Sequence, residues 1–202
     1  MFDFVKIKNW WRSRKIKFYT SLLRSSAGSI GKNSLICPPF QSFNIKEMQV
    51  GNNTRISEHC WIQCIDNYQG KSFSPRLDIG NDVHIGRFAH IIACDNIKIG
   101  NSVVIAERVY ISDNLHGFED INMPIMKQPL KQAGPVIIED EAWIGNGACI
   151  LPNVTIGKHA IIGSNAVVTK DIPPYSVAAG VPAKVIKQYN PKTKKWEKLT
   201  IS

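Results

Sequence analysis

Aliphatic residues recur at every sixth position along the second half of the chain. The series is unbroken at Ile138, Ile144, Ile150, Ile156, Ile162 and Val168. A small residue follows each of the first five after four places, at Ala142, Ala148, Val154, Ala160 and Ala166. An α-helix has a period of about 3.6 and a strand a period of about 2, so neither produces this spacing. A fixed repeat of six residues predicts a solenoid of the hexapeptide β-helix type.

Shorter runs with the same spacing occupy the first half of the chain. They begin at Ile30, Val50, Ile79 and Ile99 and are interrupted at residues 38–48 and 67–74. The longest interruption follows Ile111, because the next aliphatic residue in phase is Ile138, 27 residues later, and 27 is not a multiple of six. We therefore expect residues 116–135 to leave the coil as an extruded loop. Long irregular loops in compact domains are usually functional or disordered.

Each six-residue unit is expected to form a short strand and a turn, with its aliphatic side chain pointing inward. Asparagine tolerates positive φ and recurs at the expected corners, at Asn33, Asn53, Asn81, Asn101, Asn146 and Asn165. Three units would close one triangular coil, and about sixteen units give about five stacked coils. The pattern predicts a mainly β fold, a parallel β-helix over residues 30–187.

The N-terminal segment has a different, helical pattern. Apolar residues fall at positions 4, 7, 11, 18 and 22, and two tryptophans lie among five basic residues in 8–17. We expect residues 1–29 to form a basic helical cap on the open end of the coil. Such a helix is also typical of membrane interfaces, so peripheral membrane contact through residues 1–27 is a second, compatible interpretation. Residues 188–202 are expected to form a basic C-terminal tail.

The net charge of +9 is concentrated at the two ends. Residues 1–32 carry eight Lys/Arg and one Asp (+7), and residues 183–202 carry six Lys and one Glu (+5), which leaves 9 − 12 = −3 for the body. This distribution favours anionic small molecules or a membrane surface as partners, and not nucleic acid. Five cysteines, an odd number, argue against a disulfide framework. We expect a cytoplasmic protein. Peripheral association with the inner membrane is compatible with this expectation.

Three motifs resemble those of a known family. They are AWIGNGACILPNVTIG at 142–157, IIGSNAVVTKDIPP at 161–174 and AAGVPAKVI at 178–186. They resemble the hexapeptide-repeat acyltransferases, and within them the sugar O-acetyltransferases that act on galactosides, maltose, O-antigen, capsule or colanic acid. The resemblance implies a left-handed coil, a homotrimer with active sites between subunits, acetyl-CoA as acyl donor and no required metal.

The candidate catalytic residues lie where the extruded loop begins. His116 aligns with the family's catalytic histidine, which deprotonates the acceptor hydroxyl for direct attack on the thioester. Imidazole, with an ordinary pKa near 6.5, suits that task at neutral pH. Asp113 is a candidate for orienting His116 or binding a sugar hydroxyl, and Asn114 for contacting substrate. The alternatives are a surface loop histidine and a solvated turn aspartate.

The resemblance also implies a set of residues for the acyl donor. Trp143 matches a residue that lies against the pantetheine arm, and Asn146 one near the thioester. The remaining members of the set match contacts to coenzyme A: Ser164, Thr169, Lys170, Lys184 and Lys187. The last two replace arginines of the galactoside enzyme, and lysine binds phosphate as a point charge without the bidentate fork.

On the acceptor side the chain departs from the galactoside pattern. The family's sugar-binding Asn aligns with Gly86 and its Asp with Cys94. Asp95 is the nearest substitute, and the same coil supplies further candidates for substrate contact: His84, Arg87 and His90. The departure leaves the acceptor open.

The sequence thus predicts an acetyl-CoA-dependent O-acetyltransferase that acts on a sugar of a surface polysaccharide or its precursor. The alternatives are an antibiotic acetyltransferase of the same fold and a non-catalytic β-helix scaffold. A zinc γ-type carbonic anhydrase needs three histidines on one metal and a His-x4-His pair, whereas His84 and His90 are separated by five residues. Sugar-nucleotide pyrophosphorylases and serine acetyltransferases carry larger domains before the coil than residues 1–29.

Overall fold

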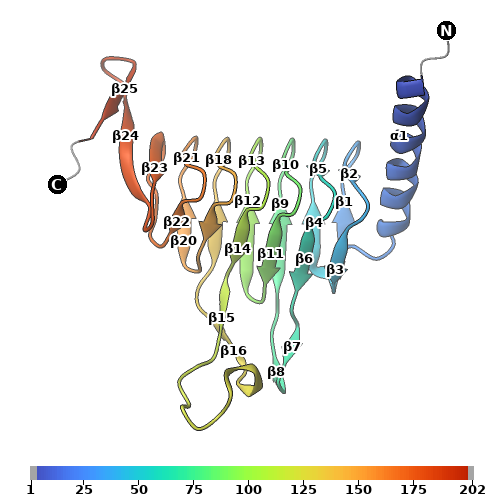
Figure 1. Ribbon diagram of the computed structural model, residues 1–202, viewed down its shortest axis with the longest axis horizontal. Helices are drawn as coiled ribbons and strands as arrows, with labels where there is room; N and C mark the ends of the chain where they lie inside the picture. The colour runs from blue at the N-terminus through green and yellow to red at the C-terminus, as the bar shows by residue number, and fades with distance from the viewer. Residues whose placement is uncertain (1–3, 200–202) are drawn as a thin grey trace.

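Three parallel sheets form the walls of a triangular prism in the computed structural model, which describes residues 4–199 (Figure 1). The first sheet, sheet A, contains β1 (Ser29–Ile30), β4 (Met48–Val50), β9 (Arg76–Ile79), β12 (Asn96–Ile99), β17 (Val136–Ile138) and β20 (Val154–Ile156). Sheet B contains β2 (Leu35–Ile36), β5 (Arg55–Ile56), β10 (His84–Ile85), β13 (Val104–Ile105), β18 (Trp143–Ile144), β21 (Ile161–Ile162) and β23 (Ser176–Ala179). Sheet C contains β3 (Gln41–Phe43), β6 (Trp61–Cys64), β11 (His90–Ala93), β14 (Tyr110–Ser112), β19 (Cys149–Ile150) and β22 (Val167–Val168).

The six-residue period produces one continuous core. On sheet B the inward aliphatic residues stand in register from coil to coil, and each is at most 1% exposed: Ile36, Ile56, Ile85, Ile105, Ile144 and Ile162. Sheet A and sheet C each contain six parallel strands, so the stack has six coils where the sequence predicts about five. The difference arises at residues 38–48. They break the sequence period, but they still complete the first coil through β3 and a 3₁₀ helix, η1 (Ile45–Glu47).

The expected asparagine corners are of two kinds. Asn33, Asn53 and Asn165 adopt positive φ, as the sequence predicts. At Asn81 and Asn101 the side-chain oxygen instead accepts a hydrogen bond from the backbone N–H of the preceding coil, at 2.8 and 2.9 Å. The residues that follow these two asparagines take the positive φ, as Gly147 does after Asn146. These side chains bind one coil to the next where the backbone turns away from the sheet.

Two arms leave the stack where sheet C turns toward sheet A. The longer arm is the hairpin of β15 (Asn114–His116) and β16 (Leu130–Gln132), which pair antiparallel and enclose the 3₁₀ helix η2 (Ile125–Lys127). The shorter arm is the hairpin of β7 (Asn67–Tyr68) and β8 (Lys71–Ser72). They lie side by side (Figure 1), and the Tyr68 hydroxyl donates to the Met126 carbonyl at 3.2 Å. The extruded loop expected at 116–135 is therefore present and begins two residues earlier.

Helix α1 (Phe4–Leu23) lies across the N-terminal end of the stack (Figure 1). Ile16 and Thr20 are buried against the first coil, and the backbone N–H of Ile36 donates to the Thr20 hydroxyl at 2.9 Å. An ion pair between Arg12 and Glu58 also ties the helix to the coil. No helix among residues 4–199 has the length and hydropathy needed to cross a membrane.

The C-terminal residues add a hairpin to the other end of sheet B. Strand β23 pairs antiparallel with β24 (Lys184–Asn190), which pairs antiparallel with β25 (Lys195–Lys198). The basic tail expected from residue 188 is thus an ordered hairpin as far as Lys198. The Trp196 ring on β25 packs edge-on to Tyr189, with centroids 5.7 Å apart. This aromatic contact and the strand pairing give the lysine-rich segment a fixed position.

Candidate active site

A buried aspartate anchors the base of the longer arm. Asp113 is 0% exposed, and its two carboxylate oxygens accept the backbone N–H groups of Cys94 and Asp95, both at 2.9 Å. The Asn114 side-chain amide donates to the same carboxylate at 3.0 Å. Such hydrogen bonds to a carboxylate are each worth about 1.5–3 kcal/mol. Asp113 therefore holds the arm to the preceding coil. Its burial excludes the alternative interpretation of Asp113 as a solvated turn residue.

His116 lies on the third residue of β15, opposite Leu130 on β16. Its side chain is exposed, while Leu130 is buried below the strand. The imidazole lies edge-on to the Tyr68 ring of the shorter arm, with centroids 5.6 Å apart and planes at 72°. Both Asp113 oxygens are occupied by other donors, so Asp113 can influence His116 only through the backbone of the arm. Tyr68 is the neighbour that sequence reasoning missed, because it lies in a short polar interruption.

Asn114 and Asp95 lie at the same corner as His116. Asn114 is buried and also donates from its side-chain amide to the Ile92 carbonyl, at 3.3 Å. Asp95 is half-buried, and its backbone N–H donates to the Asp113 carboxylate. Four predicted residues thus lie together at the base of the longer arm: Asp95, Asp113, Asn114 and His116. The Asn114 side-chain amide is occupied by hydrogen bonds that hold the arm in place.

A second set of predicted residues lies on sheet B. Trp143 is 51% exposed and stands in register with Val104 before it and Ile161 after it. The same outward row continues through Val177 to Lys187 on β24. Lys184 pairs with Ala179 near the end of this row. An exposed indole and Lys187 along one row, with Lys184 beside the end of that row, form a surface on which an extended phosphorylated molecule can lie.

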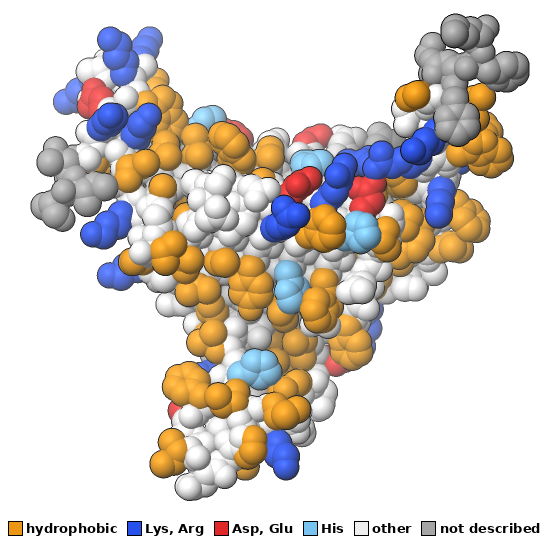
Figure 2. Space-filling model, viewed as in Figure 1, with side chains coloured by type: hydrophobic (Ala, Val, Ile, Leu, Met, Phe, Trp, Pro, Cys, Tyr) orange, Lys and Arg blue, Asp and Glu red, His pale blue; other side chains and the backbone are white. Residues whose placement is uncertain are grey.

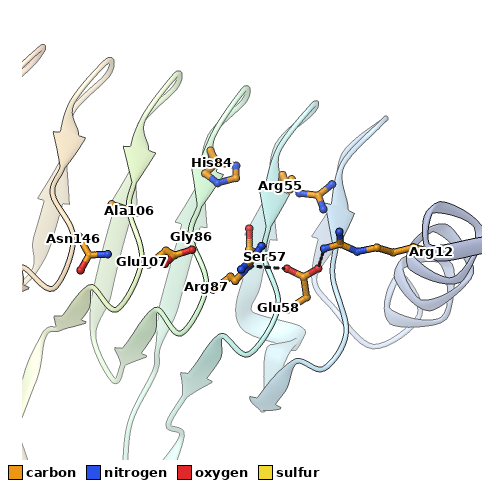
Figure 3. Close-up of a pocket in the computed structure, with 10 residues that line it drawn as sticks. All are labelled: Arg12, Arg55, Ser57, Glu58, His84, Gly86, Arg87, Ala106, Glu107 and Asn146. Carbon is orange, nitrogen blue, oxygen red and sulfur yellow. Dashed lines mark hydrogen bonds and ion pairs between the residues drawn. The ribbon is translucent and has the colours of Figure 1, made fainter. Parts of the chain in front are cut away.

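A groove with a volume of about 400 Å³ follows the corner between sheets B and C (Figure 3). Its lining crosses several coils and includes the predicted residues His84, Arg87 and Asn146. Glu58 lies at one end, between Arg12 and Arg87, whose Nε is 3.6 Å from the Glu58 carboxylate. Burial alone would raise the pKa of Glu58, but the Arg12 hydrogen bond and both guanidinium charges outweigh it and lower that pKa. The groove therefore has a carboxylate that stays ionised at neutral pH.

The remaining cofactor candidates divide between two corners. Ser164 follows Asn146 one coil later, since the backbone of Asn165 donates to the Asn146 carbonyl at 2.8 Å. Thr169 and Lys170 instead follow β22, at the corner where sheet C turns toward sheet A. From Ser164 to Thr169 the chain turns at Asn165 and crosses sheet C through β22. In one chain, the groove residues and His116 are thus on opposite sides of sheet C.

An aromatic column occupies the outer surface of sheet C between these two corners. Trp61 stacks on His90 with centroids 4.4 Å apart and planes at 8°, and Tyr110 packs edge-on to His90 at 5.5 Å. Burial lowers the pKa of His90, and its Nε2 is buried without a hydrogen-bond partner within the described chain. Figure 2 shows apolar and histidine side chains gathered on this face of the molecule. Sequence reasoning missed the column, because outward residues do not contribute to the aliphatic period.

Three buried thiols of the coils are unsuited to nucleophilic catalysis at neutral pH. Burial raises the pKa of Cys60 to about 11 and the pKa values of Cys64 and Cys94 to about 12. The thiolate is the reactive form, so these groups remain protonated near pH 7. Residues 4–199 contain no group of three His, Cys, Asp or Glu side chains placed to hold a metal ion.

Comparison with known proteins places the chain in a family. Residues 135–170 match the family described as bacterial transferase hexapeptide (six repeats). The Saccharomyces cerevisiae protein YJL218W, named as an acetyltransferase, is 40% identical over 137 residues, which are 64% of this chain and 67% of that protein. The Escherichia coli protein WbbJ, named for lipopolysaccharide biosynthesis O-acetyl transfer, is 36% identical over 125 residues, 58% of this chain and 63% of that protein.

A solved structure shares the fold. The N-acyltransferase AntD from Bacillus cereus, solved as a mutant with dTDP-4-amino-4,6-dideoxyglucose and coenzyme A, superposes with a TM-score of 0.71 at 24% identity. The similarity covers 87% of this chain and 91% of that one. The chain belongs to the hexapeptide-repeat acyltransferases, and its fold is their left-handed parallel β-helix. It spans about two thirds or less of the length of the curated relatives named above.

Proposed function

We propose that this protein transfers an acetyl group from acetyl-CoA to a hydroxyl group of a sugar, in a surface polysaccharide such as O-antigen, capsule or exopolysaccharide, or in its precursor. The observation that carries the proposal is the position of His116. It is an exposed imidazole on an arm whose base is locked by a buried carboxylate. The O-acetyl function in the name of WbbJ and the sugar-nucleotide ligand of AntD support a sugar acceptor.

His116 acts as the general base in this proposal. Its imidazole removes the proton of the acceptor hydroxyl while the hydroxyl oxygen attacks the thioester carbonyl carbon. The new C–O bond completes the ester as the C–S bond breaks, and the imidazolium returns the proton to the departing thiolate. No acyl-enzyme forms, and the high pKa values of the buried thiols suit such a direct transfer. Asp113 serves as a positioning residue that fixes the arm.

The acyl donor is assigned to the outward row of sheet B and the adjoining corner. Trp143 would cover the pantetheine arm, Asn146 and Ser164 would face the thioester end, and Lys184 and Lys187 would meet the phosphates. Lysine charge suits phosphate groups at the end of an extended molecule. Acceptor contacts are assigned to Asp95 and to the side-chain carbonyl oxygen of Asn114 beside His116, and to His84 and Arg87 in the groove.

A complete site needs two chains in this proposal. The corner bearing Asn146 and Ser164 and the arm bearing His116 are separated in one chain by sheet C. In a parallel homotrimer, the corner of one subunit faces the arm of the next, and three equivalent sites form around the ring. Thr169 and Lys170 lie at the arm's corner, so they would reach the donor bound by the neighbouring subunit. The exposed aromatic column of sheet C is suited to burial between the copies.

The direct test is thiol release from acetyl-CoA with purified protein and a panel of acceptors. The panel contains neutral sugars, amino sugars, sugar nucleotides, oligosaccharides and hydroxylated antibiotics. The proposal expects sugar-dependent thiol release and a product whose acetyl group is removed by neutral hydroxylamine, as an ester is. An amide product on an amino sugar would instead assign N-acetylation, and turnover of the antibiotics alone would assign a xenobiotic acetyltransferase.

Replacing the exposed indole tests the donor surface. Trp143→Ala is expected to raise KM for acetyl-CoA about tenfold, because the loss of an aromatic contact worth about 1.4 kcal/mol corresponds to that factor. The value of kcat should change less, since Trp143 does not contact the acceptor hydroxyl. Trp10→Ala is the matched control, with an indole 49% exposed on α1. Equal KM values for Trp143→Ala and Trp10→Ala would contradict the assignment.

A further inference from the structure

Helix α1 has a second face that the fold does not use. Ile16, at 6% exposed, marks the centre of the face that packs on the first coil. Successive residues of an α-helix are rotated by about 100° around its axis. By this count, five large apolar residues point within about 60° of the direction opposite to Ile16. These side chains are between 40% and 67% exposed: Ile7, Trp10, Trp11, Phe18 and Leu22. They form one apolar strip along the helix, turned away from the stack, which we call the outer strip.

The outer strip lies in a strongly basic setting. Helix α1 contains six Lys/Arg residues and no Asp or Glu in its sequence. Arg12 is used on the coil side, where it pairs with Glu58. By the same rotation per residue, Lys8 and Lys15 flank the outer strip on one side and Lys17 flanks it on the other. All three lysines are exposed. Figure 2 shows a row of Lys and Arg side chains running toward the α1 end of the molecule.

Aromatic rings and cations are interleaved within the strip itself. The Arg14 guanidinium lies over the Trp10 ring, 4.2 Å from its centroid, and Trp10 packs edge-on to Trp11 at 4.9 Å. A shallow hollow of about 600 Å³ is lined by Trp11, Phe18 and the neighbouring basic side chains. Arg14 lies in the middle of the strip, where a helix–helix seam would need an apolar residue. Indole rings and basic side chains together suit the headgroup region of an anionic bilayer.

We propose that the outer strip of α1 docks the protein on an anionic lipid surface. Charge complementarity carries this choice of partner: the helix has cations on both sides of an apolar strip and no acidic residue. The helix lies on the membrane and does not enter it as a span, in keeping with its hydropathy. Apolar side chains enter the interface while the flanking lysines remain among the lipid phosphates.

This docking sets the orientation of the stack. Helix α1 lies across the end of the prism, so the β-helix axis points away from the membrane (Figure 1). His116 follows the fourth coil, which places it about 25 Å above the lipid surface, counting about 10 Å for the helix layer and about 4.8 Å for each of three coil spacings. A parallel trimer, which rests on the proposed function, presents three such strips on one side. Several strips on one surface strengthen binding by avidity.

The test is co-flotation of the full-length protein with lipid vesicles. Wild-type protein is expected to float with vesicles of phosphatidylcholine and phosphatidylglycerol, and not with phosphatidylcholine alone. Trp11→Ala/Phe18→Ala should lose this binding. Lys15→Glu/Lys17→Glu should weaken it at least about fivefold for each cation removed, from about 1 kcal/mol per charge at the surface. Binding of the wild type should also fall as salt is raised.

Two matched controls separate docking from general surface effects. Lys98→Glu/Lys127→Glu changes the net charge equally at exposed sites on sheet A and on the longer arm, and Ile121→Ala removes an apolar group that is 93% exposed. Both controls should bind like the wild type. Failure of the wild type to float with anionic vesicles would overturn the proposal, as would equal losses in the controls and the α1 variants. A Trp11-dependent change in oligomeric mass without lipid would assign the strip to a protein partner and also contradict it. None of these readouts requires acetyl transfer.

Discussion

His116→Ala is expected to lower kcat for sugar O-acetylation by about 10²–10⁴-fold, the usual contribution of a positioned general base. The imidazole stands exposed on β15, where an acceptor hydroxyl can approach it. In the proposed reaction it acts on the acceptor hydroxyl and does not bind the acyl donor, so KM for acetyl-CoA should stay within about twofold. Steady-state kinetics of thiol release, with acetyl-CoA and acceptor varied separately, measures both values.

The neighbouring residue provides the control for His116. Leu115 lies on the same strand and is 45% exposed, so Leu115→Ala alters the arm without removing the base. Its kcat should remain within about threefold of the wild type, because truncation of an exposed apolar side chain costs little stability. Similar kcat values for His116→Ala, Leu115→Ala and the wild type would remove His116 from the mechanism.

Asp113→Asn is expected to lower kcat by about 10–100-fold while KM for acetyl-CoA is unchanged. The Asp113 carboxylate accepts two backbone N–H groups with its two oxygens, and an amide can accept only with one. The second N–H then loses its partner in a fully buried place, which costs about 1–3 kcal/mol. The arm should open more often, and misplacement of His116 by about 1 Å can cost 10²-fold in rate.

Limited proteolysis distinguishes this positioning role from a general loss of stability. Asp113→Asn should be cut faster by trypsin at Lys127 and Lys131 in the longer arm, while the coils stay intact. Glu119→Gln is the control on the same arm, because its pair with Lys131 is exposed and contributes little. Unchanged cleavage of the arm together with a normal kcat would contradict the role given to Asp113. The role would also be contradicted if the whole variant unfolded at a lower temperature and the arm and the coils were cleaved at the same rate.

The fold follows from the sequence because the inward residues obey one simple period. Each aliphatic residue from Ile138 to Val168 reaches a core position that is at most 1% exposed. The arm follows from the same rule, since the period fails after Ile111 and the structure leaves the coil at β15. The coil count needed the structure, because the first coil is completed by a segment without the period.

The site is less accessible to sequence reasoning, since it depends on contacts between distant segments. Asp113 is bound by backbone groups of Cys94 and Asp95, which lie 19 and 18 residues earlier, and backbone groups carry no sequence signal. Asn146 and Thr169 are both candidates for the acyl donor, but successive six-residue units occupy different faces, so they lie at different corners. Trp61, His90 and Tyr110 form a column only because coils stack in register.

Mixed trimers test most directly the central claim that one site is shared by two chains. His116→Ala and Trp143→Ala subunits are co-expressed, purified through different tags, and assayed at subsaturating acetyl-CoA. If each site takes His116 from one subunit and Trp143 from the next, about one third of the sites in mixed rings regain both residues, because each mixed ring contains one productive junction. The mixture should then exceed the mean activity of the two separate variants about sevenfold, given a tenfold loss in Trp143→Ala alone. Activity equal to that mean would place both residues in the same chain and contradict the account.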